Sequence, residues 1–153
     1  MTSISYEEIF DNFLGRVSDY DFSSMDESSV NYLMSEYLQK VLSRPYVHRL
    51  FSSIDSDAEI HLLKYEMKKP VDDYTDKNFV IDILSKGMIV EWIEPQVRNK
   101  VNLSQFFGGK EQKFFSQSNH ISELRAILED TEIALRKEIR DRGSFYNSYL
   151  EEL

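Results

Sequence analysis

The fold of this 153-residue chain is decided by the stretch Gly87–Leu128, which reads GMIVEWIEPQVRNKVNLSQFFGGKEQKFFSQSNHISELRAIL. It starts as an apolar helix that is expected to stop or kink at Pro95, because proline removes a backbone hydrogen bond. An aromatic loop over residues 103–117 is expected next, before a new helix opens at residue 118 or 119. Four phenylalanines so close together predict a surface that meets a partner.

The helix before this loop is expected to be the central element of the fold. Apolar side chains cover most of its circumference over residues 79–93, which predicts burial on nearly all sides. Gly87 would allow another helix to approach closely, and Asp72–Asp76 supplies capping groups. Two capping boxes, Ser5–Glu8 and Ser24–Glu27, predict earlier helices over residues 6–17 and from the second box to about residue 43.

The segment between these helices is ambiguous. Residues 59–67 (EIHLLKYEM) fit both a helix face and a strand alternation. Tyr46–Phe51 could add one helical turn, and Ser52–Asp57 is expected to be a polar loop. A strand at 59–67 would have Tyr46–Ile54 or nothing as its partner. A lone strand leaves its edges unpaired, so pairing with a neighbouring subunit would be needed.

The last helix is predicted from an apolar stripe at spacings of three and four, formed by Ile121, Leu124, Leu128, Thr131 and Leu135. Gly143 is expected to end this helix in a left-handed conformation. The prediction is therefore a mainly α, four-helix bundle-like domain over residues 1–143, with a small β element around residues 59–67. Residues 144–153 form an aromatic tail, interpreted as an interaction segment.

Composition limits the classes of function. The chain has no cysteine, so it holds no disulfide and no thiolate metal site. The net charge is −9, and residues 1–43 carry eight acidic side chains against Arg16 and Lys40. Such a surface disfavours binding to a phosphate backbone. Neither a signal peptide nor an apolar run of about 20 residues is visible, so no membrane role is expected.

No residue set predicts catalysis, a cofactor or a metal. Gly108-Gly109-Lys110 lacks the P-loop pattern, because Ser104 stands where its first glycine belongs and Glu111 where its final Ser or Thr belongs. The three histidines are scattered, and the paired carboxylates lie on predicted helix faces, where solvation is their ordinary role. Glu91 and Glu94 could pair with Arg98, Lys86 or a basic partner. The chain is therefore not expected to be an enzyme.

Three stretches resemble one protein family: Val90–Val97 (VEWIEPQV), Gln105–Ser116 (QFFGGKEQKFFS) and Ile139–Leu150 (IRDRGSFYNSYL). The family consists of small neck proteins, encoded by tailed phages of Gram-positive bacteria, that act as head–tail connectors (adaptor or head-completion proteins). The similarity extends more weakly to the N-terminal ISYEEIFDNFL. It also favours a strand over a helix for residues 59–67.

The resemblance implies a structural protein of the virion. Copies would form a ring, twelve-fold by family analogy, below the portal at the neck, where head and tail join around the DNA channel. The partners would be further copies, the portal protein, and a tail or second neck protein. DNA would pass through without tight binding. The protein would be in the host cytoplasm during assembly and in the virion neck afterwards.

A closed ring needs two different, mutually complementary interaction surfaces on each subunit. The candidate interface residues are Trp92, Phe106, Phe107, Gly108, Gly109, Lys110, Phe114, Phe115, Phe145, Tyr146, Tyr149 and Leu150. The alternative function, from a different class, is a small acidic intracellular regulator that binds a basic host protein as a nucleic-acid mimic. The acidic N-terminal part of the chain favours that alternative.

Overall fold

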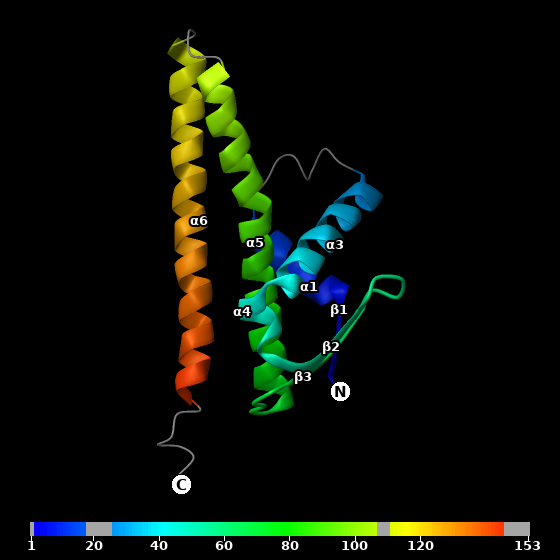
Figure 1. Ribbon diagram of the computed structural model, residues 1–153. Coiled ribbons are helices and arrows are strands. Elements are labelled where there is room, and N and C mark those ends of the chain that lie inside the picture. Colours follow the sequence, from blue (N-terminus) through cyan, green and yellow to red (C-terminus); the bar gives the residue numbers. More distant parts are fainter. Residues whose placement is uncertain (1, 18–25, 107–110, 146–153) are drawn as a thin grey trace.

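The computed structural model describes residues 2–17, 26–106 and 111–145, and the side chains of residues 99–121 and 144–145 lie outside the described part. The chain is mainly helical, at 72% helix, with a small three-stranded antiparallel sheet, which confirms the expected fold class. Two long helices, α5 (Asp73–Phe106) and α6 (Glu111–Phe145), form a hairpin, and the other elements gather against α5 (Figure 1).

The chain begins with β1 (Thr2–Ser5), which leads directly into α1 (Tyr6–Arg16). The predicted capping box is confirmed: the Ser5 hydroxyl accepts from the Glu8 backbone N–H, and the Glu8 carboxylate accepts from the Ser5 N–H. A hydrogen bond from Lys77 on α5 lowers the pKa of Glu8. One face of α1 is buried, through Tyr6, Ile9, Phe10 and Phe13.

The second helix, α3 (Glu27–Ser43), starts later than the Ser24–Glu27 capping box predicts. Asp26 is its N-cap, and its carboxylate accepts a hydrogen bond from the Ser29 backbone N–H at 2.8 Å. This single cap replaces the predicted capping box that has Ser24 as N-cap. Arg44 has extended backbone angles, as expected before Pro45. The extra helical turn is present as α4 (Pro45–His48).

The sheet resolves the ambiguous segment as two strands, β2 (Phe51–Asp57) and β3 (Leu62–Met67). The prediction of a strand within residues 59–67 is confirmed, whereas the predicted polar loop at Ser52–Asp57 is wrong. The strand order is β1-β3-β2, with both pairings antiparallel, and Tyr65 lies between Thr2 and Ile54. Both edges of β3 are therefore paired within one chain, and no neighbouring subunit is required for the sheet.

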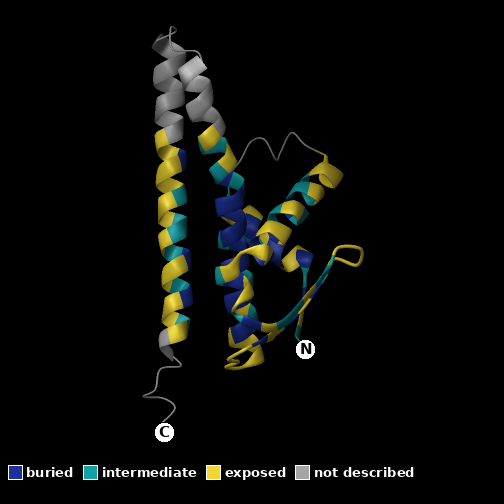
Figure 2. Cartoon of the chain, in the orientation of Figure 1, coloured by how far each residue is buried: buried dark blue, intermediate teal, exposed yellow. Residues whose placement is uncertain are grey.

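The central helix α5 has most of its described apolar positions buried in the core (Figure 2). Gly87 is a point of close approach, since a Cβ built on it would lie 2.6 Å from Cγ1 of Val41 on α3. Of the two outcomes expected at Pro95, a stop or a kink, the stop is wrong, because α5 continues to Phe106. Pro95 is exposed, and in the turn that it interrupts the Gln96 amide donates to the Trp92 carbonyl while Arg98 pairs with Glu94.

The last helix, α6, is longer than predicted at both ends. It begins at Glu111 and not at residue 118 or 119, because EQKFFSQS contains no glycine or proline to prevent helix formation. Gly143 does not end it, because no described glycine has a positive φ and the helix runs to Phe145. The predicted stripe faces the core through buried Leu124 and Leu135. Among the described residues, no helix is both long and apolar enough to cross a membrane.

Candidate interaction surface

A groove runs along α6 on the side bordered by α3 and α4. Three adjoining depressions form it, with volumes of about 640, 760 and 390 Å³. The first two share Tyr46, Val90 and Glu132, and the last two share Arg49 and Ile139, so the three adjoin one another along α6. We call these adjoining depressions the α6 groove.

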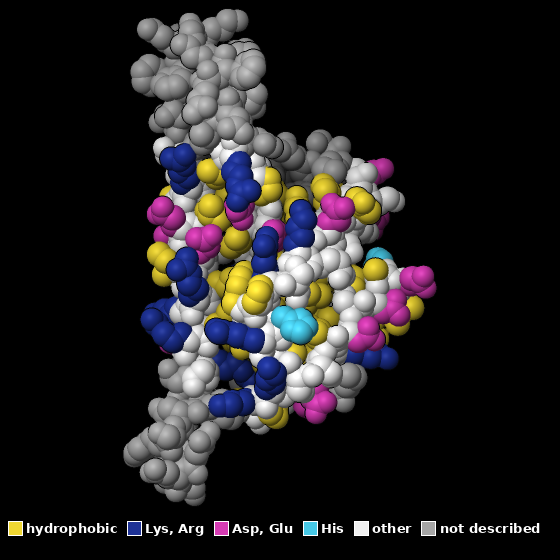
Figure 3. All heavy atoms as spheres, in the orientation of Figure 1, with side chains coloured by type: hydrophobic (Ala, Val, Ile, Leu, Met, Phe, Trp, Pro, Cys, Tyr) yellow, Lys and Arg dark blue, Asp and Glu magenta, His cyan; other side chains and the backbone are white. Residues whose placement is uncertain are grey.

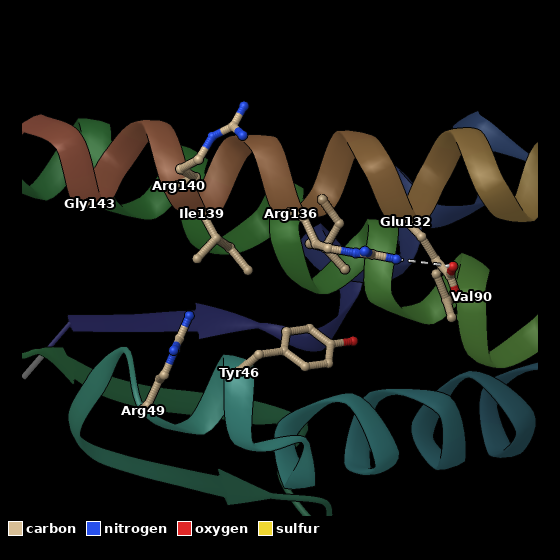
Figure 4. Close-up of a pocket in the computed structure, with 9 residues that line it drawn as sticks. Tyr46, Arg49, Val90, Glu132, Arg136, Ile139, Arg140 and Gly143 are labelled. Carbon is tan, nitrogen blue, oxygen red and sulfur yellow. Dashed lines mark hydrogen bonds and ion pairs between the residues drawn. The ribbon is translucent and has the colours of Figure 1, made fainter.

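The floor of the α6 groove is apolar. Val90 of α5 and Leu135 and Ile139 of α6 line it and are buried. The half-buried ring of Tyr46 lies between α4 and α6, and Ile139 points from α6 toward it (Figure 4). Burial raises the pKa of this tyrosine, and the nearby Glu91 carboxylate adds to the shift. Such a floor favours an apolar or aromatic occupant over a highly solvated one.

The rim of the α6 groove is basic, although the chain has a net charge of −9 and only 18 Lys and Arg. Nine cationic side chains line the groove: Lys40, Arg44, Arg49, Lys68, Lys69, Arg98, Arg136, Arg140 and Arg142. Three carboxylates oppose them: Glu91, Glu94 and Glu132. Figure 3 shows Lys and Arg over α6 and around α4, with hydrophobic side chains between them. Acidic side chains lie over the upper part of α6 and toward the β2–β3 turn.

Some of these cations are already paired inside the fold. The Arg44 guanidinium donates to the buried Glu91 carboxylate at 2.7 Å, and this hydrogen bond raises the pKa of Arg44. Arg142 donates to the buried Asp76 carboxylate at 2.6 Å. Of the alternative partners named for Glu91 and Glu94, Arg98 pairs with Glu94, whereas Lys86 pairs with Glu138. Glu91 pairs with Arg44, which the sequence reasoning did not name. These pairs hold the groove walls in place.

Two other cations at the middle of the groove are open to a partner. Arg49 is exposed and forms no ion pair within the described part of the chain. Arg136 is 75% exposed, and its Nη2 lies 3.5 Å from the Glu132 carboxylate, a long and solvent-screened pair. Arg49 rises from α4 toward α6 on one side of the Tyr46 ring, while Arg136 comes from α6 above it (Figure 4). The two guanidinium groups lie on opposite sides of Tyr46, so each could pair with a different carboxylate of a partner.

Trp92 lies on the other side of the α5–α6 contact. It is half-buried, and its ring meets Phe13 edge-on at a centroid distance of 6.4 Å. It lines a separate depression of about 430 Å³ together with Ile89 and the exposed Ile127. Trp92 therefore packs against the core and is partly exposed in this depression.

The other predicted interface residues cannot be compared with the groove. The side chains of Phe106, Phe114, Phe115 and Phe145 lie outside the described residues, as do residues 107–110 and Tyr146, Tyr149 and Leu150 as a whole. The predicted loop at residues 103–117 is nevertheless corrected, because α5 runs to Phe106 and α6 starts at Glu111. The three stretches that carry the family resemblance all belong to the α5–α6 hairpin or follow directly from it.

Sequence reasoning missed the groove residues Tyr46, Arg49, Arg136 and Ile139. One signal was present on α6, where Arg136 and Arg140 lie one turn apart and Ile139 continues the apolar stripe. Nothing in the sequence indicated that α4 would face this part of α6, since the two segments lie far apart along the chain.

The part of the chain that the structure describes contains no group of His, Asp and Glu side chains able to hold a metal ion. Comparison of the chain with protein-family models, with curated proteins and with solved structures finds no match. The arrangement of an apolar floor and a basic rim supports binding of a partner in the α6 groove.

Proposed function

We propose that this protein is a structural subunit of a tailed-phage neck, a head–tail connector whose copies assemble into a ring below the portal. The observation that carries this proposal is the family resemblance of Val90–Val97, Gln105–Ser116 and Ile139–Leu150. These stretches are concentrated on one helical hairpin, α5–α6, which is the longest feature of the fold. In this proposal the hairpin is the element through which copies assemble.

The surface chemistry supports the same proposal. A subunit of a closed ring uses a heterologous interface, so it needs two different complementary patches. The α6 groove, with its apolar floor and basic rim, is one such patch. The aromatic residues at the adjoining ends of the two long helices and after α6 supply candidates for the second. The excess negative charge elsewhere suits a ring that lets DNA pass without holding it.

Location in the particle tests this function directly. We expect antibodies against the chain to label the junction between head and tail in purified phage particles, viewed by immunogold electron microscopy. We also expect the chain to sediment with those particles. A chain found only in the soluble fraction of infected cells, bound to a basic host protein, would favour the acidic regulator instead.

Assembly can be tested with the aromatic residues at the hairpin connection. Burying each ring in an interface contributes about 1.5–3 kcal/mol, so Phe107→Ser with Phe115→Ser should weaken ring formation and leave helicity intact. Native mass spectrometry and circular dichroism measure the two effects. The matched control is Tyr32→Ser with Tyr74→Ser, since both tyrosines are exposed on other parts of the fold. Normal rings from the Phe107/Phe115 variant would rule out these residues as an interface.

A further inference from the structure

The α6 groove defines the chemistry of its occupant. Buried Val90, Leu135 and Ile139 with the Tyr46 ring form an apolar floor, which suits aliphatic and aromatic side chains. Arg49 and Arg136 at its middle suit carboxylates. A nucleic acid would use the cations but leave the apolar floor unused. The groove therefore fits an acidic peptide segment with aromatic or aliphatic side chains.

A segment of this composition exists in the chain itself. Residues 146–153 read YNSYLEEL, with two tyrosines and two leucines for the floor and Glu151 and Glu152 for the arginines. The segment follows directly from α6, and Gly143 near the end of α6 already borders the groove. Charge and apolar character are thus complementary between the groove and residues 146–153.

We propose that the α6 groove binds residues 146–153 of a second copy of this chain. Entry into the groove of the same subunit would require the chain to reverse direction, and a β-turn uses four residues. The two tyrosines would then lie in the turn and not on the apolar floor of the groove. Eight extended residues reach about 26–29 Å, which is enough to leave one subunit and lie on another.

This contact is heterologous, because a tail from one copy meets a groove on the next. Repetition of a heterologous contact gives a ring when the rotation closes. The inference rests on the proposed function, because it makes the tail of one subunit the partner of the groove on the next subunit of the proposed ring. It also supplies counter-charges for Arg49 and Arg136, the two exposed arginines at the middle of the groove.

A charge-swap experiment on the full-length chain tests the contact. One variant carries Arg49→Glu and Arg136→Glu, and a second carries Glu151→Arg and Glu152→Arg. Each alone should self-associate about tenfold more weakly than the unmodified chain, because like charges then face each other across the contact. An equimolar mixture should associate again, since each groove then meets a tail of opposite charge. Analytical ultracentrifugation and native mass spectrometry measure the masses.

The control is Lys64→Glu with Lys137→Glu, two exposed lysines outside the groove that give the same change in net charge. This variant should associate like the unmodified chain. Circular dichroism checks that all variants fold. The inference is overturned if the unmodified chain stays monomeric, if the control weakens association as much as the groove variant, or if mixing fails to restore association.

The outcome separates the inference from the proposed function. If mixing the two charge-swap variants restores association but gold label is absent from the phage neck, the tail-in-groove contact stands and the connector function is excluded. Gold label at the neck without restored association would do the reverse. A mass equal to two copies would keep the contact as a reciprocal exchange and exclude a ring.

Discussion

Arg142, in the last turn of α6, donates a hydrogen bond to Asp76 in the first turn of α5, with 2.6 Å between Nη2 and Oδ1. Both side chains are nearly buried. Arg142 also donates to the Lys69 carbonyl at 2.9 Å and lies 4.5 Å above the centre of the Phe79 ring, while Asp76 accepts from the Val71 backbone N–H. These contacts hold the C-terminal turn of α6 against the N-terminal turn of α5, at the end of the hairpin opposite its connection.

The first prediction concerns this pair. Arg142→Met should lower the free energy of unfolding by about 3–5 kcal/mol, because it leaves the Asp76 carboxylate buried without its counter-charge. Urea denaturation near neutral pH measures the loss. Arg136→Met is the control, since its exposed pair with Glu132 should contribute no more than about 1 kcal/mol. Equal losses in the two variants would contradict a structural role for the buried pair.

The second prediction compares two helical glycines. Gly87→Ala should destabilise the protein by about 1–3 kcal/mol, because the new methyl group would overlap Val41. Gly143→Ala meets nothing within 4 Å and should stabilise α6 by up to about 1 kcal/mol. Thermal unfolding of both variants checks the opposite signs. Val41→Ala should recover part of the loss in the Gly87→Ala background, and no recovery would show that α3 does not set the constraint.

The third prediction concerns Tyr65 in β3, whose buried hydroxyl has no hydrogen-bond partner among the described residues. Tyr65→Phe should leave stability at neutral pH unchanged or raise it by up to about 1 kcal/mol, because an unsatisfied polar group is removed. Tyr6→Phe is the control and should destabilise, since the Tyr6 hydroxyl bonds to Ser56 and Gln39. A clear loss of stability in the Tyr65 variant would show that its hydroxyl is satisfied.

The pH dependence of the same variant gives a second test. Burial raises the pKa of Tyr65 to about 12 from an ordinary value of 10.0. The folded state therefore holds this proton more tightly than the unfolded state. The associated stability is complete below pH 10 and is lost as the pH rises toward 12. Denaturation at several pH values between 10 and 12 measures the free energy of unfolding. This free energy should fall less steeply with pH for Tyr65→Phe than for the unmodified chain, and identical slopes would exclude a buried phenol.

The fourth prediction concerns nucleic acid. At physiological salt we expect the dissociation constant for duplex DNA to be no lower than about 10⁻⁴ M, the weak end of the non-specific range. The chain has a net charge of −9, and Arg44 and Arg142 in the groove are already paired with carboxylates. Fluorescence anisotropy with a labelled duplex measures this. Micromolar affinity that falls as salt is added would show that the basic groove contacts DNA.

Part of the fold could be predicted because the signals are local. The Ser5–Glu8 capping box, the apolar stripe of α6 and the break before Pro45 each depend on residues within one or two turns of each other. Gly87 was also read correctly as a point of close approach, because a missing side chain on an apolar helix face leaves space for a neighbour. The local sequence is sufficient for features of this kind.

The sheet shows where local reading ends. Phe51–Asp57 is polar enough to read as a loop, and Thr2–Ser5 is too short to be read as a strand. Both became strands because β3, distant from β1 along the chain, offers hydrogen-bonding partners on both of its edges. Similarly, Pro95 was expected to stop or kink its helix because of its local cost. The helix does not stop there: α5 continues past Pro95, and α5 and α6 contact each other extensively as a hairpin.

The sequence by itself determined the helical class, the central position of the helix over residues 79–93 and the acidic, cysteine-free character of the chain. Only the tertiary structure decided which distant segments meet: Arg142 with Asp76, Val41 with Gly87, and the α4 residues Tyr46 and Arg49 with α6. The physical reason is that periodicity and capping are short-range, whereas a groove and a buried ion pair depend on the packing of the whole chain.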